Sequence, residues 1–420
     1  MKIALSPDIH CYYAGKYDVL DKSGNSLRKR EWIRIANKML ATCKEQKVDV
    51  LIVPGDFFVN PKPTAEQVLL VAKMLRAFEH AGIKVVGITG NHDVGGARST
   101  SMDEVVAEIG RNRKWCYTTF DTTVIGEGDN AVGFAFLPFV KAHEISAYNP
   151  DYAGRALSDK LTNIAEGLFE KLGDVKTKIL VGHWSIQGAV TSSGKKMEST
   201  LTGAEPVLQT SALVEQGWDA CMFGHIHVPQ VLCDKKKNGP FIAYSGCFQR
   251  INVGEAGDAR GFYIYNTEDA SYSFHALPAI PMKVFSKEIS SKEDFDALIA
   301  EIKETPLKGR YAYVKYTINK DDFALVDKKD IEKALTEQNP LSIIGIMPKV
   351  IYEARQRDAT LTESLDGETA LVKWLGNKGV DADRVARILG KFREMSDKLN
   401  SGDDDEDDPL MPAGGPVKAA

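Results

Sequence analysis

The sequence predicts an α/β protein in which a largely parallel β-sheet is flanked by helices. Five short apolar segments, typical of buried strands, each end in an aspartate, an asparagine or a histidine, and glycine introduces four of these ends. Two amphipathic helices separate the first three segments, which is the βαβ pattern of a parallel sheet. In open α/β sheets ligands bind beyond the carboxyl ends of the strands, so the five polar ends can converge on one site.

The clearest of the five segments is 83–93. Its apolar part is short, β-branched and bounded by glycine, which indicates a buried strand. The strand runs into Gly90-Asn91-His92-Asp93, where glycine allows the backbone to turn sharply. Taken alone, this tetrapeptide is equally compatible with a polar turn that binds nothing. Recurrence of the pattern at four other strand ends favours a ligand site.

The other four strands are expected at 3–5, 48–54, 178–181 and 219–223. The candidate metal ligands at the five ends are Asp8, His10, Asp56, Asn91, His183, His225 and His227, with His92 and Asp93 alongside. Oxygen donors mixed with imidazoles suit Mn²⁺, Fe²⁺ or Zn²⁺ and argue against calcium, which prefers oxygen alone. Because the set contains no cysteine, a structural zinc site built from thiolates is disfavoured.

Seven donors are too many for one metal with an open position, but they suffice for two metals that share a bridging carboxylate. Two metals about 3.5–4 Å apart hold the attacking and the leaving oxygen of a phosphoryl displacement. The sequence therefore predicts a phosphoesterase site.

These strand ends resemble the motifs of calcineurin-like metallophosphoesterases. The matching pieces, in chain order, are Asp8-x-His10, Gly55-Asp56, Gly90-Asn91-His92-Asp93, Gly182-His183 and Gly224-His225-x-His227. The resemblance implies the family's β-sandwich flanked by helices. It implies one metal held by Asp8, His10, Asp56 and His227, and a second held by Asp56, Asn91, His183 and His225. It also implies that His92 protonates the leaving oxygen or stabilises the developing charge, with Asp93 orienting its ring.

Residues 1–278 are more specifically similar to the SbcD-type DNA repair nucleases. The pieces that carry this similarity are Ala243-Tyr244-Ser245-Gly246, Arg250-Ile251-Asn252-Val253-Gly254-Glu255 and Arg260-Gly261-Phe262. The resemblance implies two Mn²⁺ ions (with Mg²⁺, Fe²⁺ or Zn²⁺ as possible substitutes), DNA as substrate, and a homodimer. It implies an exonuclease and endonuclease that acts in double-strand-break repair and recombination.

The chain departs from the family at two positions. Tyr12 occupies the place of the glycine in the family's Asp-x-His-x-Gly motif. Val59 stands three residues after Asp56, where the nuclease branch usually has a histidine associated with the processing of duplex ends. The second departure leaves the balance between exonuclease and endonuclease activity open.

With 420 residues, the chain is expected to form more than one domain. We expect the nuclease domain at 1–278 and, after the proline-bounded segment 278–281, a small α+β module at 279–355. SbcD-like proteins carry a DNA-facing capping domain at this place, and a purely structural appendage is the alternative. Beyond it, 356–400 is expected to form a helix–loop–helix, and 401–420 an acidic disordered tail.

The predicted helix pair is too small to bury its apolar faces alone, so it is expected to dock on something. By resemblance, 360–400 contacts the coiled-coil base of an SMC-family ATPase such as SbcC. The alternative is packing on the chain's own capping module. The sequence has no GxxxxGK[ST] motif, so a partner would have to supply ATP hydrolysis.

The remaining elements follow from periodicity and capping signals. Helices are expected at 30–43, 64–81, 101–110, 157–172, 292–302, 329–336, 368–375 and 383–399. Further strands are expected at 132–139, 230–234, 241–245, 261–266, 282–285, 311–318 and 343–352. The polar stretch 187–203 is expected to be a loop, whose Lys195 and Lys196 either touch phosphates or are merely solvated.

Composition leaves the substrate open. Of 53 basic and 58 acidic residues, one and six respectively lie in 402–420, which leaves 52 of each sign in the body of the chain. Charge therefore neither supports nor excludes DNA binding. The six cysteines show no CxxC pattern, so buried reduced thiols are expected. No apolar run approaches 18 residues and the first ten residues lack a signal-peptide core, so we expect a cytoplasmic protein without membrane segments. That it is DNA-associated is implied by the resemblance to SbcD-type nucleases.

Two other functions compete with the nuclease hypothesis. The first is a phosphatase or a small-molecule phosphodiesterase, since the five motifs do not distinguish these substrates from DNA. The second is a non-catalytic scaffold on the same fold. All seven candidate ligands and His92 are present, which argues against the scaffold.

Overall fold

The computed structural model describes residues 1–12, 18–95, 115–141, 145, 157–198, 206–351 and 367–401. The helix expected at 101–110 and the tail beyond 401 lie outside these residues. The chain divides into two compact units, Met1–Val350 and Ile351–Ala420, which we describe separately. Within the described ranges, none of the helices is long and apolar enough to cross a membrane.

The first sheet of the larger unit has six strands in the order β14-β13-β1-β2-β3-β4. Strands β1, β2, β3 and the edge strand β4 are parallel, whereas β13 runs antiparallel to β1 and β14 antiparallel to β13. The strands are β1 Lys2–Leu5, β2 Val50–Val53, β3 Lys84–Ile88, β4 Cys116–Tyr117, β13 Gly261–Asn266 and β14 Tyr272–Ala276.

The second sheet also has six strands, in the order β11-β12-β10-β7-β6-β5. The four middle strands are parallel, and antiparallel strands close both edges. The strands are β5 Asp121–Ile125, β6 Val132–Leu137, β7 Thr177–His183, β10 Ala220–Gly224, β11 Gln230–Cys233 and β12 Phe241–Tyr244.

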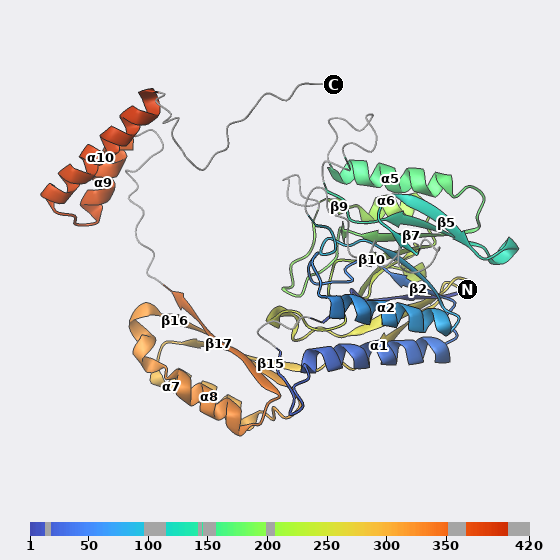
Figure 1. Ribbon diagram of the computed structural model, residues 1–420, viewed down its shortest axis with the longest axis horizontal. Helices are drawn as coiled ribbons and strands as arrows, with labels where there is room; N and C mark the ends of the chain where they lie inside the picture. The colour runs from blue at the N-terminus through green and yellow to red at the C-terminus, as the bar shows by residue number, and fades with distance from the viewer. Residues whose placement is uncertain are drawn as a thin grey trace. The chain divides into compact units, whose positions relative to one another are not determined.

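The two sheets pack face to face over a shared core. This core takes alternate side chains from strands of both sheets, such as Ile52 and Val86 from the first, and Phe134, Val181 and Met222 from the second. Helices α1 (Leu27–Glu45) and α2 (Ala65–His80) cover the outer face of the first sheet, and α5 (Leu157–Lys171) and α6 (Thr210–Glu215) that of the second (Figure 1). The predicted α/β class, with a β-sandwich flanked by helices, is confirmed.

Individual expectations were confirmed where a local signal was strong. Helix α2 begins with Thr64 as N-cap, and the Thr64 and Gln67 side chains form the reciprocal bonds of a capping box. Strands β5 and β14 were missed, because both lie at sheet edges. Their side chains are partly or largely exposed, so they lack the alternating apolar pattern of a half-buried strand. All six cysteines are buried thiols outside any disulfide, as expected.

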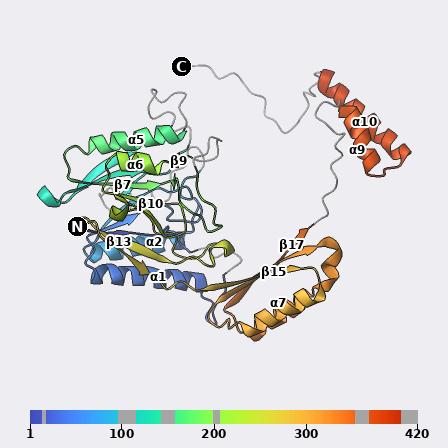
Figure 2. The ribbon, with the colours of Figure 1, turned by 180° about the vertical axis from the view of Figure 1, so that it is seen from behind.

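A third sheet forms the module after the sandwich. Strands β15 (Met282–Ile289) and β16 (Tyr311–Asn319) pair in parallel, β17 (Ser342–Ile351) lies beside β16, and helices α7 (Lys292–Glu304) and α8 (Lys328–Glu337) pack on one face (Figure 2). The core between sheet and helices contains Phe285, Leu298, Val314, Ile331 and Leu335.

The smaller unit contains a helical hairpin, α9 (Gly367–Asn377) and α10 (Ala382–Ser401). Arg393 on α10 donates from Nε to the Glu368 carboxylate on α9, over 3.0 Å. Val372, Trp374 and Met395 are nonetheless 41, 49 and 65% exposed. The hairpin therefore has apolar surface that its own packing does not cover.

A buried ion pair lies where the sandwich meets the small module. Arg28 on α1 donates from Nη1 to the Glu31 carboxylate (3.0 Å) and from Nη2 to the Arg250 carbonyl oxygen (2.8 Å). The other Glu31 oxygen accepts the backbone N–H of Ile280, at the entry to the module. Charge and hydrogen bonding therefore join α1 to both chain segments at this junction.

Replacing Glu31 with alanine is expected to lower the free energy of unfolding by about 3–5 kcal/mol, because Arg28 then keeps a buried charge without its partner. Chemical denaturation followed by circular dichroism measures the change. Lys38→Ala, at an exposed position of the same helix, is the matched control and should change stability by less than about 0.5 kcal/mol. Equal unfolding midpoints for the two variants would contradict a stabilising role for the ion pair.

Candidate active site

The structure brings all seven sequence-predicted metal ligands together at the carboxyl ends of five strands. Three of these strands belong to the first sheet (β1, β2 and β3) and two to the second (β7 and β10). The parallel middle strands of each sheet point their carboxyl ends toward the same edge of the sandwich, which explains how residues 8 and 227 meet.

The first cluster contains Asp8, His10, Asp56 and His227. One candidate ligand atom from each of the four lies within 4.8 Å of the others. His10 Nε2 is 3.1 Å from His227 Nε2 and 3.4 Å from Asp56 Oδ2. His227 Nε2 is 3.7 Å from Asp8 Oδ2.

The second cluster centres on the side-chain oxygen of Asn91. This Oδ1 atom lies 2.9 Å from His183 Nε2 and 3.0 Å from His225 Nδ1. His183 Nε2 is in turn 3.4 Å from Asp56 Oδ2, the same distance that separates this oxygen from His10 Nε2 in the first cluster. Asp56 Oδ2 therefore lies between the two clusters, where a bridging carboxylate is needed.

Two glycines allow the strand ends to approach this closely. A Cβ on Gly90 would lie 2.2 Å from Asp56 Oδ1, and one on Gly224 would lie 2.5 Å from Asp8 Oδ1. Three of the candidate ligands themselves have positive φ angles: 38° at His10, 52° at Asp56 and 92° at His225. Such backbone strain persists only where surrounding structure imposes it, and it is concentrated at functional sites.

Backbone carbonyls fix which ring nitrogen faces the site. His10 Nδ1 lies 3.1 Å from the Phe58 oxygen, and His183 Nδ1 lies 2.6 Å from the Pro54 oxygen. A carbonyl can only accept, so each Nδ1 carries the proton and each Nε2 presents its lone pair to the cluster. This is how histidines that bind metals are oriented.

The pKa values of Asp8, Asp56 and His10 are all shifted by burial and by their neighbours in the site. Burial, with a contribution from nearby Asp56, raises the pKa of Asp8 well above its usual value. Burial acts in the same direction on Asp56, but the rings of His183 and His10 outweigh it, so the pKa of Asp56 falls below its usual value. Burial lowers the pKa of His10 to about 3, which keeps that imidazole neutral and able to bind a metal.

One buried atom tests whether metals fit this site. Asp8 Oδ1 is fully buried, and the described residues offer it no hydrogen-bond partner. A buried carboxylate oxygen without a partner is strongly destabilising unless a cation compensates it. The donors around it are carboxylates, neutral imidazoles and an amide oxygen, which is a set that binds Mn²⁺, Fe²⁺ or Zn²⁺. The residues therefore fit a pair of divalent metals.

Glu255 supports the first cluster from behind, and sequence reasoning did not include it among the site residues. Its carboxylate lies 2.9 Å from His227 Nδ1, accepts the Ile251 N–H at 3.1 Å, and pairs with Arg260 at 2.5 Å. This contact leaves His227 Nε2 to face the cluster. The signal was available, because Glu255 and Arg260 belong to the pieces that resemble SbcD-type nucleases.

Cys247 also lies within reach of His10 and His227. Its thiol donates to the Gln249 carbonyl oxygen at 3.0 Å, and burial raises its pKa well above the usual value. A protonated thiol that donates elsewhere is a poor metal ligand. We therefore do not add Cys247 to either cluster.

His92 lies beside the first cluster, with its ring centre 4.9 Å from that of His10. Its Nδ1 is 2.8 Å from the Val59 carbonyl oxygen, so the backbone at this departure from the family pattern holds the ring. The Asp93 carboxylate was expected in that role. Its oxygens accept backbone N–H groups of Phe57, Phe58 and Gly90, which fastens the turns that carry Asp56 and Asn91, and its role in orienting the His92 ring stays a prediction.

The other departure, Tyr12, does not obstruct the site. The Tyr12 side chain is buried and its hydroxyl donates to Glu66 on α2. Gln67 Nε2 donates to the backbone oxygens of Cys11 and Tyr12, both at 3.0 Å. The turn that lacks the family's glycine is therefore held by α2.

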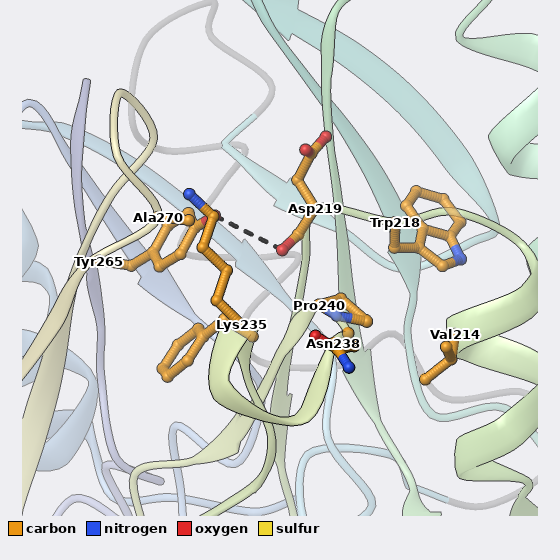
Figure 3. Close-up of a pocket in the computed structure, with 10 residues that line it drawn as sticks. Val214, Trp218, Asp219, Lys235, Asn238, Pro240, Tyr265 and Ala270 are labelled. Carbon is orange, nitrogen blue, oxygen red and sulfur yellow. Dashed lines mark hydrogen bonds between the residues drawn. The ribbon is translucent and has the colours of Figure 1, made fainter.

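A separate cavity of about 420 Å³ lies at the opposite ends of the strands (Figure 3). Asp219 and Phe241, which line it, stand where β10 and β12 begin, whereas His225 follows the end of β10. The hydroxyl of Tyr265 donates to the backbone oxygen of Asp219 there, at 3.4 Å. This cavity is distinct from the candidate active site.

Comparison with known proteins agrees with this geometry. A family model described as calcineurin-like phosphoesterase matches residues 1–229, more than half of the chain. One similar solved structure, described as a novel archaeal phosphodiesterase, is 13% identical with a TM-score of 0.29, and the match covers 66% of this chain and all of that one. A dimetal phosphatase from Danio rerio is 10% identical with a TM-score of 0.37, and the match covers 63% and 91% of the two chains. At such TM-scores neither structure bears on the substrate.

Replacing Glu255 with glutamine is expected to weaken Mn²⁺ binding about 10- to 100-fold, because His227 loses the carboxylate that orients its ring and raises its basicity. Isothermal titration calorimetry on protein first stripped with EDTA measures the affinity. Asp56→Asn, which alters the atom shared by both clusters, is expected to weaken binding further.

The matched control for this prediction is Glu288→Gln, an exposed glutamate on β15 that should leave Mn²⁺ affinity unchanged. If Glu255→Gln binds Mn²⁺ like the control while Asp56→Asn does not, Glu255 has no part in holding the metal site.

Proposed function

Since the chain belongs to the calcineurin-like phosphoesterase family, we propose that it is an Mn²⁺-dependent DNA exonuclease and endonuclease. In this proposal it hydrolyses phosphodiester bonds at DNA ends during double-strand-break processing and recombination. The family membership and the two ligand clusters support phosphoester hydrolysis. The choice of DNA rests on further residues.

The observation that supports DNA most directly is the position of Glu255 and Arg260. A metallophosphoesterase of any specificity needs the five strand ends. The segment 250–262, in contrast, is part of the resemblance to SbcD-type nucleases, and its Glu255 contacts a candidate metal ligand, His227. The piece of sequence that points to DNA is thus built into the site.

Two divalent ions at the clusters would supply the positive charge that stabilises the phosphoryl transition state and lowers the pKa of the attacking water. Asp56 is placed to bind both ions. Its Oδ1 accepts the His92 backbone N–H at 2.9 Å, which leaves Oδ2 between the two clusters. Asp8 is similarly fastened by the His225 N–H, which Oδ2 accepts at 2.9 Å. Both carboxylates are therefore fixed before substrate arrives.

His92 is the residue placed to handle the leaving oxygen. The Val59 carbonyl oxygen accepts a hydrogen bond from Nδ1–H, so Nε2 is the ring nitrogen available to a substrate. A proton held there can pass to the departing 3′ or 5′ oxygen, or its charge can stabilise that oxygen as the bond breaks.

The module built from β15–β17 is proposed to cap the DNA-facing side of the site. The segment that carries Glu255 continues into contact with this module, because Val253 and Ala256 pack against Met282, Tyr311 and Ile344. The module is therefore joined to the back of the metal site by direct packing.

The partner is proposed to be an SbcC-like ATPase of the SMC family, bound through 360–400. Support comes from the exposed Val372, Trp374 and Met395 of the α9–α10 hairpin. Aromatic and methionine side chains are enriched at protein interfaces, and these three lie on a hairpin too small to bury them. The homodimer implied by the resemblance stays a prediction.

A phosphatase or small-molecule phosphodiesterase on the same site is the second candidate. Its support is that both ligand clusters are complete without any residue specific to DNA. A non-catalytic scaffold has no such support, because the seven candidate ligands and His92 converge as catalysis requires.

The wild-type protein is expected to degrade end-labelled duplex DNA in Mn²⁺ and to lose this activity in EDTA. His92→Ala is expected to reduce cleavage at least about 100-fold, because proton transfer to the leaving oxygen contributes 10²–10⁴-fold. Gel analysis of the labelled ends measures the rate and the polarity. His275→Ala, a histidine on edge strand β14, is the matched control and should cleave normally.

Bis-p-nitrophenyl phosphate separates the two candidate functions. Hydrolysis of this compound without cleavage of DNA would favour the small-molecule phosphodiesterase. Hydrolysis of neither substrate, with Mn²⁺ bound, would leave the scaffold as the function to test.

Removing residues 360–420 is expected to abolish co-purification with the SMC-family ATPase while leaving Mn²⁺ affinity unchanged, since the metal site lies wholly in the other unit. Trp374→Ala/Met395→Ala in the full chain is the finer test, because it removes the exposed apolar contacts and keeps the hairpin. Full binding of the ATPase by both proteins would contradict the proposed interface.

A further inference from the structure

Residues 188–197 form a tight hairpin that follows β7, the strand that ends in His183. Gly188 N–H donates to the Met197 oxygen at 2.8 Å, and Met197 N–H donates to the Ala189 oxygen at 2.7 Å. Val190 pairs with Lys196 in an antiparallel bridge. The expected loop is therefore an ordered element in this part.

The tip of the hairpin is closed by its own backbone and hydroxyl groups. Thr191 N–H donates to the Lys195 oxygen at 2.9 Å, and the Thr191 and Ser193 hydroxyls are 2.9 Å apart. Gly194 supplies the positive φ, 78°, that the turn requires. This geometry presents Lys195 and Lys196 to solvent from a defined backbone.

Two side chains fasten the hairpin to the sandwich. Gln230 bonds to Val190 twice, accepting its N–H and donating to its oxygen, both at 2.9 Å. Ser192 donates to the Asp258 carboxylate at 2.6 Å. Both fastening points come from segments that continue from candidate active-site residues, since Gln230 follows His227 by three positions.

The hairpin lies close to both ligand clusters along the chain. It begins five residues after His183, and Gln230 stands three residues after His227. Three residues span at most about 11 Å. This limit applies to Gln230, whose side chain bonds to Val190 at the base of the hairpin. Since successive nucleotides along one strand of duplex DNA advance about 3.4 Å, Gln230 lies within about three nucleotides of a bond held at His227.

The hairpin is cationic without internal compensation. Residues 188–197 contain two lysines and no acidic residue. Lys195 and Lys196 are exposed, and the ion pairs found among the described residues include neither of them. Asp258 contacts Ser192 and the exposed Glu198 follows the hairpin, but neither forms an ion pair with Lys195 or Lys196 among the described residues. Exposed lysines beside hydroxyl groups are a typical arrangement for contacting phosphate oxygens.

We propose that the 188–197 hairpin is a docking surface for the nucleic-acid backbone, on which Lys195 and Lys196 contact phosphates a few nucleotides away from the bond to be cleaved. This inference rests on the proposed DNA substrate and deepens it. A small phosphodiester held at the metals lacks the flanking phosphates that such a surface would contact. The surface therefore distinguishes a polymeric substrate from a small one.

The test measures duplex binding in full-length His92→Ala protein with Mn²⁺, which keeps the ligand clusters while suppressing cleavage. Lys195→Gln/Lys196→Gln is compared with Lys236→Gln/Lys237→Gln, which removes the same charge from exposed lysines between β11 and β12. The probe is a fluorescein-labelled 30-base-pair duplex, followed by anisotropy from 50 to 300 mM salt.

We expect the hairpin pair to raise the dissociation constant about tenfold and to reduce the slope of log affinity against log salt by about 1–2, since each lost phosphate contact removes about 0.9. The control pair should keep the parent slope. Hydrolysis of bis-p-nitrophenyl phosphate in the wild-type background should be unchanged by either pair.

Each other outcome overturns a defined claim. If the parent binds duplex and both pairs keep its slope, the hairpin is not the docking surface although the proposed function stands. If the parent binds no duplex but the wild type hydrolyses the small phosphodiester, the proposed DNA substrate fails and the inference with it. Weaker binding of the ATPase by the hairpin pair, with DNA binding intact, would assign the surface to the protein partner instead.

Discussion

The structure depends above all on two carboxylates buried side by side. Asp8 and Asp56 end neighbouring parallel strands, β1 and β2, and the side chains of both are almost wholly inaccessible to water. Burial and mutual repulsion both raise the pKa of Asp8, and its free oxygen finds no partner among the described residues. Bound cations relieve such a constraint, and histidines from both sheets surround these carboxylates with lone pairs that can bind the same cations. The packing of the two sheets therefore stabilises a pair of buried carboxylates, Asp8 and Asp56, that would repel each other without a cation.

The constraint extends into the backbone. Glycines allow the strand ends to meet, and three candidate ligands accept left-handed conformations that ordinary residues avoid. Behind them, backbone carbonyls and the Glu255 carboxylate hold the outer ring nitrogens. His10, His183 and His227 are therefore each fixed twice, by the strand end that carries the residue and by a partner behind the ring. This is why the ligand set can be assembled from segments so distant in sequence.

The sequence predicted the structure and the site best where a few consecutive residues form a recognisable motif. Motifs such as Gly90-Asn91-His92-Asp93 predicted the candidate ligands that the structure brings together, and Thr64 predicted the start of α2. It was less informative where function depends on tertiary contact. The ring of His92 is held by the carbonyl of Val59, and no side-chain pattern encodes a backbone oxygen. Edge strands such as β14 were missed for a related reason, because exposure removes the apolar alternation on which strand prediction depends.

The segment 250–256 has a consequence for how the molecule responds to metals. Its Glu255 contacts His227, while its Arg250 donates from Nη1 to the Ile280 oxygen at 3.0 Å and its Val253 packs on the small module. One short stretch of chain thus contacts both a candidate metal ligand, His227, and the neighbouring β15–β17 module. Metal occupancy and the position of that module share a single set of contacts, so their free energies are linked. By reciprocity, whatever restrains the module also adjusts how firmly the first metal is held.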